Sequence, residues 1–160
     1  MKLVVKIGGQ VAEEPKGRRR LARQIVELRR AGHAVVVVHG GGKTLTRTLD
    51  RLGIATEFHQ GLRVTDAATR DVALMVLAGI VNKQWVAEFA ALGQPALGIC
   101  GGDAGLVYAK KISLGSNGPK KDLGYVGRPT RSGPAFSRWP CGKALSPWWP
   151  AWGSGRGENS

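Results

Sequence analysis

The feature that most constrains the fold is a run of four valines at residues 35–38, which leads into His39 and three glycines at residues 40–42. Consecutive β-branched residues favour a strand buried on both faces, as in a parallel sheet. Residues 43–52 carry leucines at helical spacing. We therefore expect the glycines to lie between a strand end and a helix N-terminus, where backbone N–H groups can bind an anion.

Two familiar phosphate-binding motifs do not fit these glycines. A P-loop needs a further glycine five positions before its Gly-Lys pair, and Val37 stands there. A dinucleotide-binding fingerprint needs a third glycine at the position of Leu45. The triple glycine alone is equally compatible with a structural turn, so both interpretations stay open.

The segment before the valines predicts a β-α-β unit. Residues 2–7 are mostly apolar and stop at Gly8, and Pro15 begins a stretch with apolar residues at helical spacing that Gly32 ends. Such units connect parallel strands, so both strands should end at the same edge of the sheet. Open α/β sheets bind their ligands at that edge.

Later segments extend this α/β pattern. We expect a hairpin or loop at residues 57–64, a helix capped by Thr65 and Asp66 that runs to about Gly79, and a second helix toward Gly93. A strand at residues 95–99 and an antiparallel pair at residues 106–111 and 123–126 follow. The predicted fold is α/β, with an open, mainly parallel sheet between helices.

The composition of the 160 residues fits one domain and excludes several classes of protein. The net charge of +13 raises nucleic-acid binding as an alternative, but no stripe of aromatic and basic residues supports it, and the arginines of residues 18–30 resemble a solvated helix face. No apolar run is long enough to suggest a membrane span, and the two cysteines lack metal-site spacing. We expect a cytoplasmic protein that does not bind a membrane and has no metal-ligating residues of its own.

Residues 128–160 differ from the rest, since they hold four of the five tryptophans and five of the eight prolines without periodicity. We expect an irregular tail after a first part at residues 1–127. Tryptophan has a single codon, so a shifted reading frame can be tested on the sequence itself. Over residues 141–150 that frame permits Arg-Glu-Gly-x-Ile-Pro-Val-Val-Ala, a helix end followed by a buried strand. The tail is therefore interpreted as a frameshift product.

Five short motifs of the first part occur together in an informative order: Lys-Ile-Gly-Gly (residues 6–9), His-Gly-Gly-Gly (39–42), Gly-Leu-Arg-Val-Thr (61–65), Ala-Gly-Ile-Val-Asn-Lys (78–83) and Gly-Tyr-Val-Gly (124–127). This series resembles the amino acid kinase family, and within it the acetylglutamate kinases. The resemblance implies ATP-dependent phosphorylation, with Mg²⁺, of the side-chain carboxylate of N-acetyl-L-glutamate, a step of arginine biosynthesis. It also makes a homo-oligomer an expectation.

The resemblance assigns roles to six residues. By family analogy they are Lys6 as the catalytic cation, Gly8 and Gly9 as phosphate-binding glycines, and Gly41, Gly42 and Arg63 as substrate-binding residues. Phosphoryl transfer needs such cations and backbone donors around the moving group. A guanidinium fork also suits the α-carboxylate of the substrate. Without the resemblance, Lys6 would be an ordinary solvated lysine at a strand end.

Other polar residues are given supporting roles. His39 is expected to orient the glycine turn rather than to act as a base, because the substrate carboxylate is already ionised at neutral pH. Asp103 is read as a turn residue, and Asn82 and Lys83 as structural residues between two helices. The family's nucleotide site and second lysine find no match in residues 128–160. We therefore expect impaired activity in an N-terminal, acyl-acceptor-binding half, with an inactive N-acetylglutamate-binding fragment as the alternative.

Overall fold

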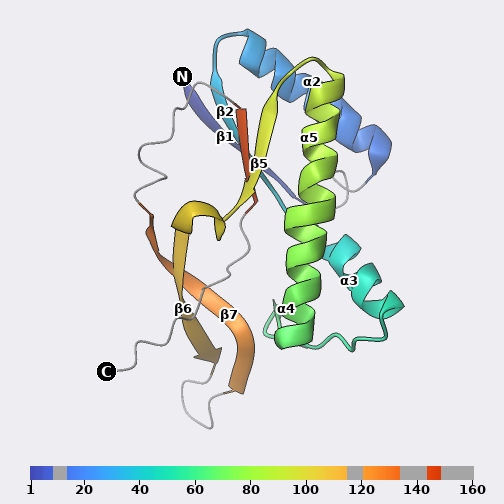
Figure 1. Ribbon diagram of the computed structural model, residues 1–160, viewed down its shortest axis with the longest axis vertical. Helices are drawn as coiled ribbons and strands as arrows, with labels where there is room; N and C mark the ends of the chain where they lie inside the picture. Colours follow the sequence, from blue (N-terminus) through green and yellow to red (C-terminus); the bar gives the residue numbers. More distant parts are fainter. Residues whose placement is uncertain (9–13, 115–120, 134–143, 149–160) are drawn as a thin grey trace.

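The computed structural model describes residues 1–8, 14–114, 121–133 and 144–148 (Figure 1). Its elements are, in chain order, β1 (Lys2–Ile7), α2 (Pro15–Arg30), β2 (Ala34–His39), α3 (Gly42–Arg51), β3 (Phe58–His59), β4 (Leu62–Arg63), α4 (Ala67–Ala73), the π-helix η1 (Leu74–Val81), α5 (Asn82–Ala91), β5 (Ala96–Cys100), the short 3₁₀ helix η2 (Asp103–Gly105), β6 (Val107–Leu114), β7 (Lys121–Ser132) and β8 (Ala144–Trp148).

The main sheet of the described residues is open and parallel, with the strand order β1-β2-β8-β5. β1 and β2 pair over their whole length, from Lys2 opposite Ala34 to Ile7 opposite His39. The N–H of Gly40 donates to the carbonyl of Ile7 at 3.3 Å, so the two strand ends stay together. This arrangement confirms the predicted β-α-β unit and the shared edge of its strand ends.

Side-chain burial alternates along β2 and shows which face of the sheet packs against the core. Val35 and Val37 are each 1% exposed and pack with buried residues of α2 and of α5. Val36 and Val38, which point to the other face, are only partly buried. The apolar sequence of β1 is typical of a buried strand, but β1 is the edge strand of the described sheet and its Val4 is 73% exposed. Val4 stands opposite Val36, so its side chain lies on the face of the sheet away from the buried Val35 and Val37.

One continuous helical run, formed by α4, η1 and α5, crosses the molecule beside the sheet (Figure 1). Asp66 caps its start, as expected, and accepts a hydrogen bond from the Thr69 N–H at 2.7 Å. The expected break at Gly79 is absent, because the chain passes through it in π-helical geometry. Within the described residues this run is long and apolar enough to span a membrane by composition, but its Trp85 and Phe89 lie in the core.

Two antiparallel pairs complete the described fold. β3 and β4 form the hairpin expected at residues 57–64, and β6 pairs with β7 in the expected appendage, which extends away from the sheet in Figure 1. β7 continues to Ser132, beyond the boundary placed after residue 127. Thr65 forms a parallel bridge with Gly124, which ties the appendage to the segment after the hairpin.

The expectation of an irregular stretch from residue 128 onward has to be narrowed. Residues 144–148 form β8, which pairs with β2 on one side and with β5 on the other. Backbone pairing does not depend on an alternating side-chain pattern, and this segment has none. Residues 134–143, with Cys141, and residues 149–160 lie outside the described residues.

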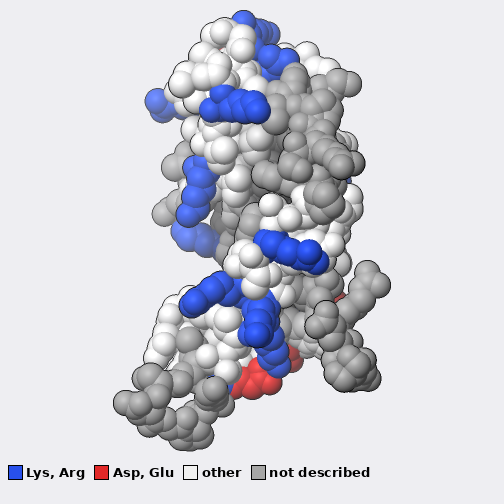
Figure 2. All heavy atoms as spheres, turned by 90° about the vertical axis from the view of Figure 1, so that its left-hand side faces the viewer, with Lys and Arg blue, Asp and Glu red and all other residues white. Residues whose placement is uncertain are grey.

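On the face seen in Figure 2, the Lys and Arg side chains of the described residues form separate groups along the long axis, and Asp and Glu lie mainly at one end. Of the arginines in α2, most are exposed, as expected for a solvated face. Arg18 instead contacts α5, where its Nε lies 3.3 Å from the Glu88 carboxylate and its Nη1 donates to Gln84.

Candidate functional site

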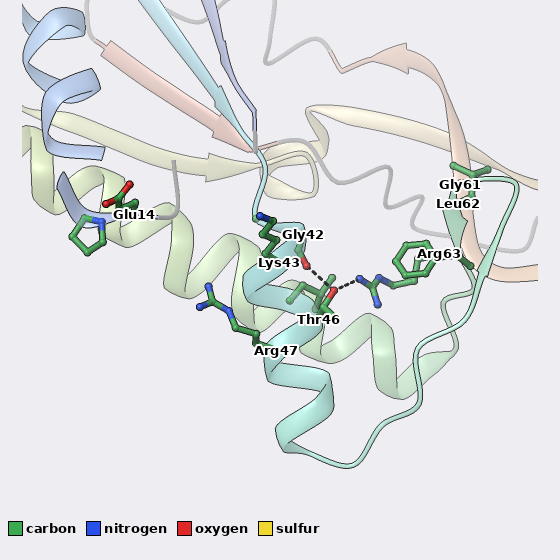
Figure 3. A pocket seen from close by; sticks show the side chains of 12 residues that line it. Glu14, Gly42, Lys43, Thr46, Arg47, Gly61, Leu62 and Arg63 are labelled. Carbon is green, nitrogen blue, oxygen red and sulfur yellow. Dashed lines mark hydrogen bonds between the residues drawn. The ribbon is translucent and has the colours of Figure 1, made fainter. Parts of the chain in front are cut away.

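A cavity of about 1050 Å³ opens between the start of α2, the first turns of α3 and the β3–β4 hairpin (Figure 3). Its size is at the upper end of what small-molecule sites usually have. It is lined by Glu14, Pro15, Gly41, Gly42, Lys43, Leu45, Thr46, Arg47, Phe58, Gly61, Leu62 and Arg63. The predicted substrate-binding residues Gly41, Gly42 and Arg63 therefore share one cavity.

The glycine turn places the N-terminus of α3 at this cavity. Gly41 is the N-cap residue of α3 and, as a glycine, has no side chain of its own to cap this terminus. The N–H groups of a first helical turn have no acceptor within the helix, and the helix dipole makes this end positive. Gly41 also lies tightly against η1, because a Cβ there would be 2.7 Å from Leu77 Cδ2 and 3.1 Å from Val81 Cγ2. The turn is therefore positioned by packing as well as by the strand before it.

Arg63 is held in place from three sides. Its Nη2 donates to the Thr46 hydroxyl at 2.8 Å and its Nη1 to the Thr56 hydroxyl at 3.0 Å. Its guanidinium carbon lies 4.6 Å from the centre of the Phe58 ring. Thr46 in turn donates to the carbonyl of Gly42 at 2.9 Å, so Arg63 is linked to the glycine turn through one hydroxyl (Figure 3).

The charge state of Arg63 suits an anionic ligand. Partial burial lowers the pKa of the Arg63 guanidinium, while the Asp50 carboxylate acts in the opposite direction. The ordinary pKa of an arginine is so far above neutral pH that the side chain remains protonated after such a change. A guanidinium has five N–H donors, and two bind threonine hydroxyls among the residues that the structure describes. The others remain able to bind a carboxylate.

The described lining of the cavity combines charged and apolar residues. Among them Lys43, Arg47 and Arg63 are cationic and Glu14 is anionic. Pro15, Leu45, Phe58 and Leu62 supply the apolar lining. A small molecule with two carboxylates and a short aliphatic part fits this combination, because opposite charges and buried methylenes both favour binding.

The structure does not bring all the predicted site residues into the cavity. Lys6 is exposed near the end of β1, opposite Val38, and Gly8 follows that strand. Both lie at the same sheet edge as the glycine turn, but neither lines the cavity. Gly9 is outside the described residues. The roles of Lys6, Gly8 and Gly9 in phosphate binding therefore stay predictions.

Several lining residues were missed by reasoning from sequence, and some of them had left a usable signal. Phe58 stands directly opposite Arg63 in the β3–β4 ladder. The hairpin was expected, and its register would have paired the two residues. Thr46 lies one helical turn after Gly42, so a helix starting at the glycines puts both at the cavity. Glu14 and Pro15 come from a distant part of the chain and left no local signal.

Metal ligands are not grouped in the part of the chain that the structure describes. No set of three or more His, Cys, Asp or Glu side chains there could hold an ion. Asp103 accepts a hydrogen bond from the Cys100 N–H at 2.6 Å, which is the turn role expected for it. The described residues thus fit phosphate groups at a helix N-terminus but not a dedicated Mg²⁺ site, and Mg²⁺ is commonly held by nucleotide phosphates with few protein ligands.

Comparison with known sequences identifies relatives of this chain. The acetylglutamate kinase of Koribacter versatilis is 51% identical over 127 residues, which cover 79% of this chain and 47% of the relative. That of Acidobacterium capsulatum is 50% identical over 139 residues, which cover 87% of this chain and 50% of the relative. The chain thus spans about half the length of the curated relatives it matches.

Solved structures show the same fold. The N-acetylglutamate synthase of Neisseria gonorrhoeae, solved with coenzyme A and N-acetyl-glutamate, superimposes with a TM-score of 0.73 at 25% identity, over 92% of this chain and 33% of that one. A Streptococcus mutans protein has a TM-score of 0.72 at 22% identity, over 92% of this chain and 58% of that one. The model of the amino acid kinase family matches residues 1–131. The chain therefore belongs to the amino acid kinase family.

Proposed function

We propose that this chain forms the acyl-acceptor-binding half of an acetylglutamate kinase, which acts in the cytoplasm in arginine biosynthesis. The observation that carries the proposal is the meeting of Gly41, Gly42 and Arg63 in one positively charged cavity. The named relatives and the solved neighbour with N-acetyl-glutamate support this choice of substrate. The acceptor would be N-acetyl-L-glutamate, and ATP with Mg²⁺ would supply the phosphoryl group.

The two carboxylates of N-acetyl-L-glutamate match two different parts of the cavity. Arg63 offers a fixed, planar fork for the α-carboxylate, and the threonine hydroxyls hold that fork in place. The N-terminus of α3 offers backbone donors to a second anionic group. Phe58 and Leu62 provide apolar surface for the acetyl methyl group and the side-chain methylenes.

The transfer step requires positive charge where the phosphoryl group passes between two anions. Bound ATP supplies that group and its Mg²⁺ neutralises phosphate charge. On this chain, Lys6 is the cation assigned to that position, and Gly8 and Gly9 are the assigned backbone donors. The location of Lys6 and Gly8 at the sheet edge beside the glycine turn supports the assignment. No general base is needed, because a carboxylate is already ionised.

The first test is calorimetry on the whole chain with N-acetyl-L-glutamate. We expect saturable heat for this ligand and at least tenfold weaker binding of N-acetyl-L-glutamine and of L-glutamate. The first control removes the side-chain charge, and the second replaces the acetyl group by a charged amine that apolar surface disfavours. Equal binding of all three ligands, or no heat, would contradict the proposal.

A kinase assay distinguishes the two versions of this proposal, an active kinase and an inactive fragment that only binds the acceptor. An active kinase would release ADP in the presence of both substrates, whereas an inactive acceptor-binding fragment would give binding heat without ADP. We expect binding with impaired turnover. A nucleic-acid-binding module is the other alternative, and it would show salt-sensitive retention of RNA or DNA with no response to N-acetyl-L-glutamate.

We also propose that residues 128–160 are read in a shifted frame. β8 pairs on both sides, although its sequence Ala-Leu-Ser-Pro-Trp is a weak strand sequence. The shifted frame also has a proline there, but it permits Ile-Pro-Val-Val-Ala, whose β-branched residues favour a strand. Sequencing the gene through the codons for residues 136–160 tests this. We expect the shifted frame to continue into kinase-like sequence with Asn and Asp, and an early stop codon would refute the proposal.

A further inference from the structure

His39, the last residue of β2, is a buried polar group next to the glycine turn. It is 2% exposed, and its Nδ1 lies 2.9 Å from the carbonyl oxygen of Gly40. A carbonyl only accepts, so Nδ1 carries the proton of a neutral ring. Burial lowers the pKa of His39 more than the Gly40 hydrogen bond raises it, which keeps the ring neutral near pH 7. Nε2 is then a hydrogen-bond acceptor.

Asn82 meets that acceptor from the helical run. It is 0% exposed, and its Nδ2 lies 3.3 Å from His39 Nε2 and 3.5 Å from the Ile99 carbonyl oxygen. Its Oδ1 accepts from the Lys83 ammonium at 3.1 Å. All these contacts agree on one orientation of the amide, with the NH₂ group toward two acceptors and the oxygen toward a cation. The amide is therefore oriented from both ends.

The neighbouring strand leaves room for this amide. A Cβ on Gly98 of β5 would lie 2.0 Å from Asn82 Oδ1 and 2.8 Å from Asn82 Cγ. Lys83 also donates to the Gly98 carbonyl at 3.0 Å, so the ammonium joins the amide to β5. Thus Gly98 of β5 and Lys83 of α5 together fix the buried side chain of Asn82. A residue that served only to join two helices would not require this.

We propose that Asn82 is a positioning residue for the acceptor cavity, acting through His39. Asn82 holds His39 in the Nδ1–H form, and His39 holds the Gly40 carbonyl, which orients the turn that carries Gly41 and Gly42 into the cavity. The same helical run packs against Gly41 through Leu77 and Val81. The turn is then set by an apolar contact and a polar one from one helix. This proposal rests on the proposed function, which assigns the cavity to the acyl acceptor.

Imidazole NMR tests the first link in the unmodified protein. The chain has three histidines, and His33 and His59 are partly exposed references in the same sample. We expect long-range ¹H–¹⁵N spectra to show His39 as the neutral Nδ1–H tautomer, which persists as the pH falls because burial lowers the pKa of His39. Imidazole in water favours the Nε2–H tautomer, so finding that form at His39 would overturn the proposal.

A charge substitution tests the second link. In Asn82→Asp a carboxylate replaces the donor, so His39 should gain a proton on Nε2 and its pKa should rise, although the nearby Lys83 ammonium opposes part of the rise. We expect the affinity for N-acetyl-L-glutamate to fall at least tenfold. Gln84→Glu makes the same chemical change at an exposed position of α5 and should alter neither property. If His39 gains this proton and the affinity for N-acetyl-L-glutamate stays the same, the proposal is overturned.

A second readout separates this proposal from the proposed function. If the unmodified chain fails to bind N-acetyl-L-glutamate, the proposed function fails, and the backbone amide shifts of Gly41 and Gly42 become the measure of the turn. Their change in Asn82→Asp, but not in Gln84→Glu, supports the positioning role, and unchanged shifts refute it. If Asn82→Asp does not fold, the tautomer of His39 in the unmodified chain decides the proposal.

Discussion

Gly124→Ala is expected to destabilise the fold strongly, and more than the same substitution at Gly127, the other described glycine of β6 and β7. Gly124 has a φ of +72°, and a Cβ there would lie 2.1 Å from the Thr65 carbonyl oxygen. The Thr65 N–H donates to the Leu123 carbonyl at 2.9 Å and the Tyr125 N–H donates to the Thr65 carbonyl at 2.7 Å, so the methyl group would separate these partners. We expect a loss of about 3–5 kcal/mol in the free energy of unfolding.

Gly53 provides a matched control for Gly124. Its φ is +69°, but a Cβ there would meet nothing within 4 Å. Gly53→Ala therefore carries only the cost of a left-handed backbone, about 1–2 kcal/mol. Urea unfolding followed by far-UV circular dichroism measures both variants. If the two variants lose the same free energy of unfolding, the close approach of Gly124 to Thr65 is not the reason why position 124 requires a glycine.

Arg63→Ala is expected to have the largest effect on ligand binding. The substitution removes a charge-assisted fork, which is worth about 2–3 kcal/mol, so the Kd for N-acetyl-L-glutamate should rise roughly 30- to 150-fold. Arg63→Lys should recover only a small part of the loss, because a lysine keeps the charge but not the planar pair of donors. Calorimetry measures both, with circular dichroism to verify the fold.

Arg47 serves as the control for charge alone. It lines the same cavity but is exposed on α3. An exposed charge is screened by water and salt, so Arg47→Ala should weaken binding less than tenfold. If Arg47→Ala and Arg63→Ala have equal effects, the cavity attracts anions through its general charge and Arg63 holds no defined carboxylate.

Local patterns were enough to predict most of the elements. The four valines, the helical spacing after Pro15 and the turn glycines each determine structure within a few residues of themselves. Gly79 misled the prediction because glycine disfavours a helix by only about 1 kcal/mol. Buried Val76, Leu77 and Val81 around it outweigh that cost by packing on the core. The strand β8 was missed because backbone pairing with β2 and β5 gives no periodicity to its sequence.

The site was predictable where its residues lie close in sequence or share a motif. The strand-to-helix junction places Gly41 and Gly42 at a helix N-terminus, and the family resemblance adds their assigned roles and that of Arg63. The hydrogen bond from Asn82 to His39 joins residues 43 positions apart, and no local pattern marks it. Asn82 was therefore read as a structural residue. Contacts of this kind depend on how the helical run crosses the sheet, which is set by the whole core.

The most direct test of the account is an NMR titration of the ¹⁵N-labelled chain with N-acetyl-L-glutamate. We predict saturable shifts at the backbone amides of Gly41, Gly42 and Thr46 and at the Arg63 side-chain Nε–H, all of which belong to the cavity. Signals from the contact between Arg18 and Glu88, which are not among the described lining residues of the cavity, should stay unchanged. Shifts confined to other parts of the chain, or none that saturate, would contradict the assignment of this cavity as the acceptor site.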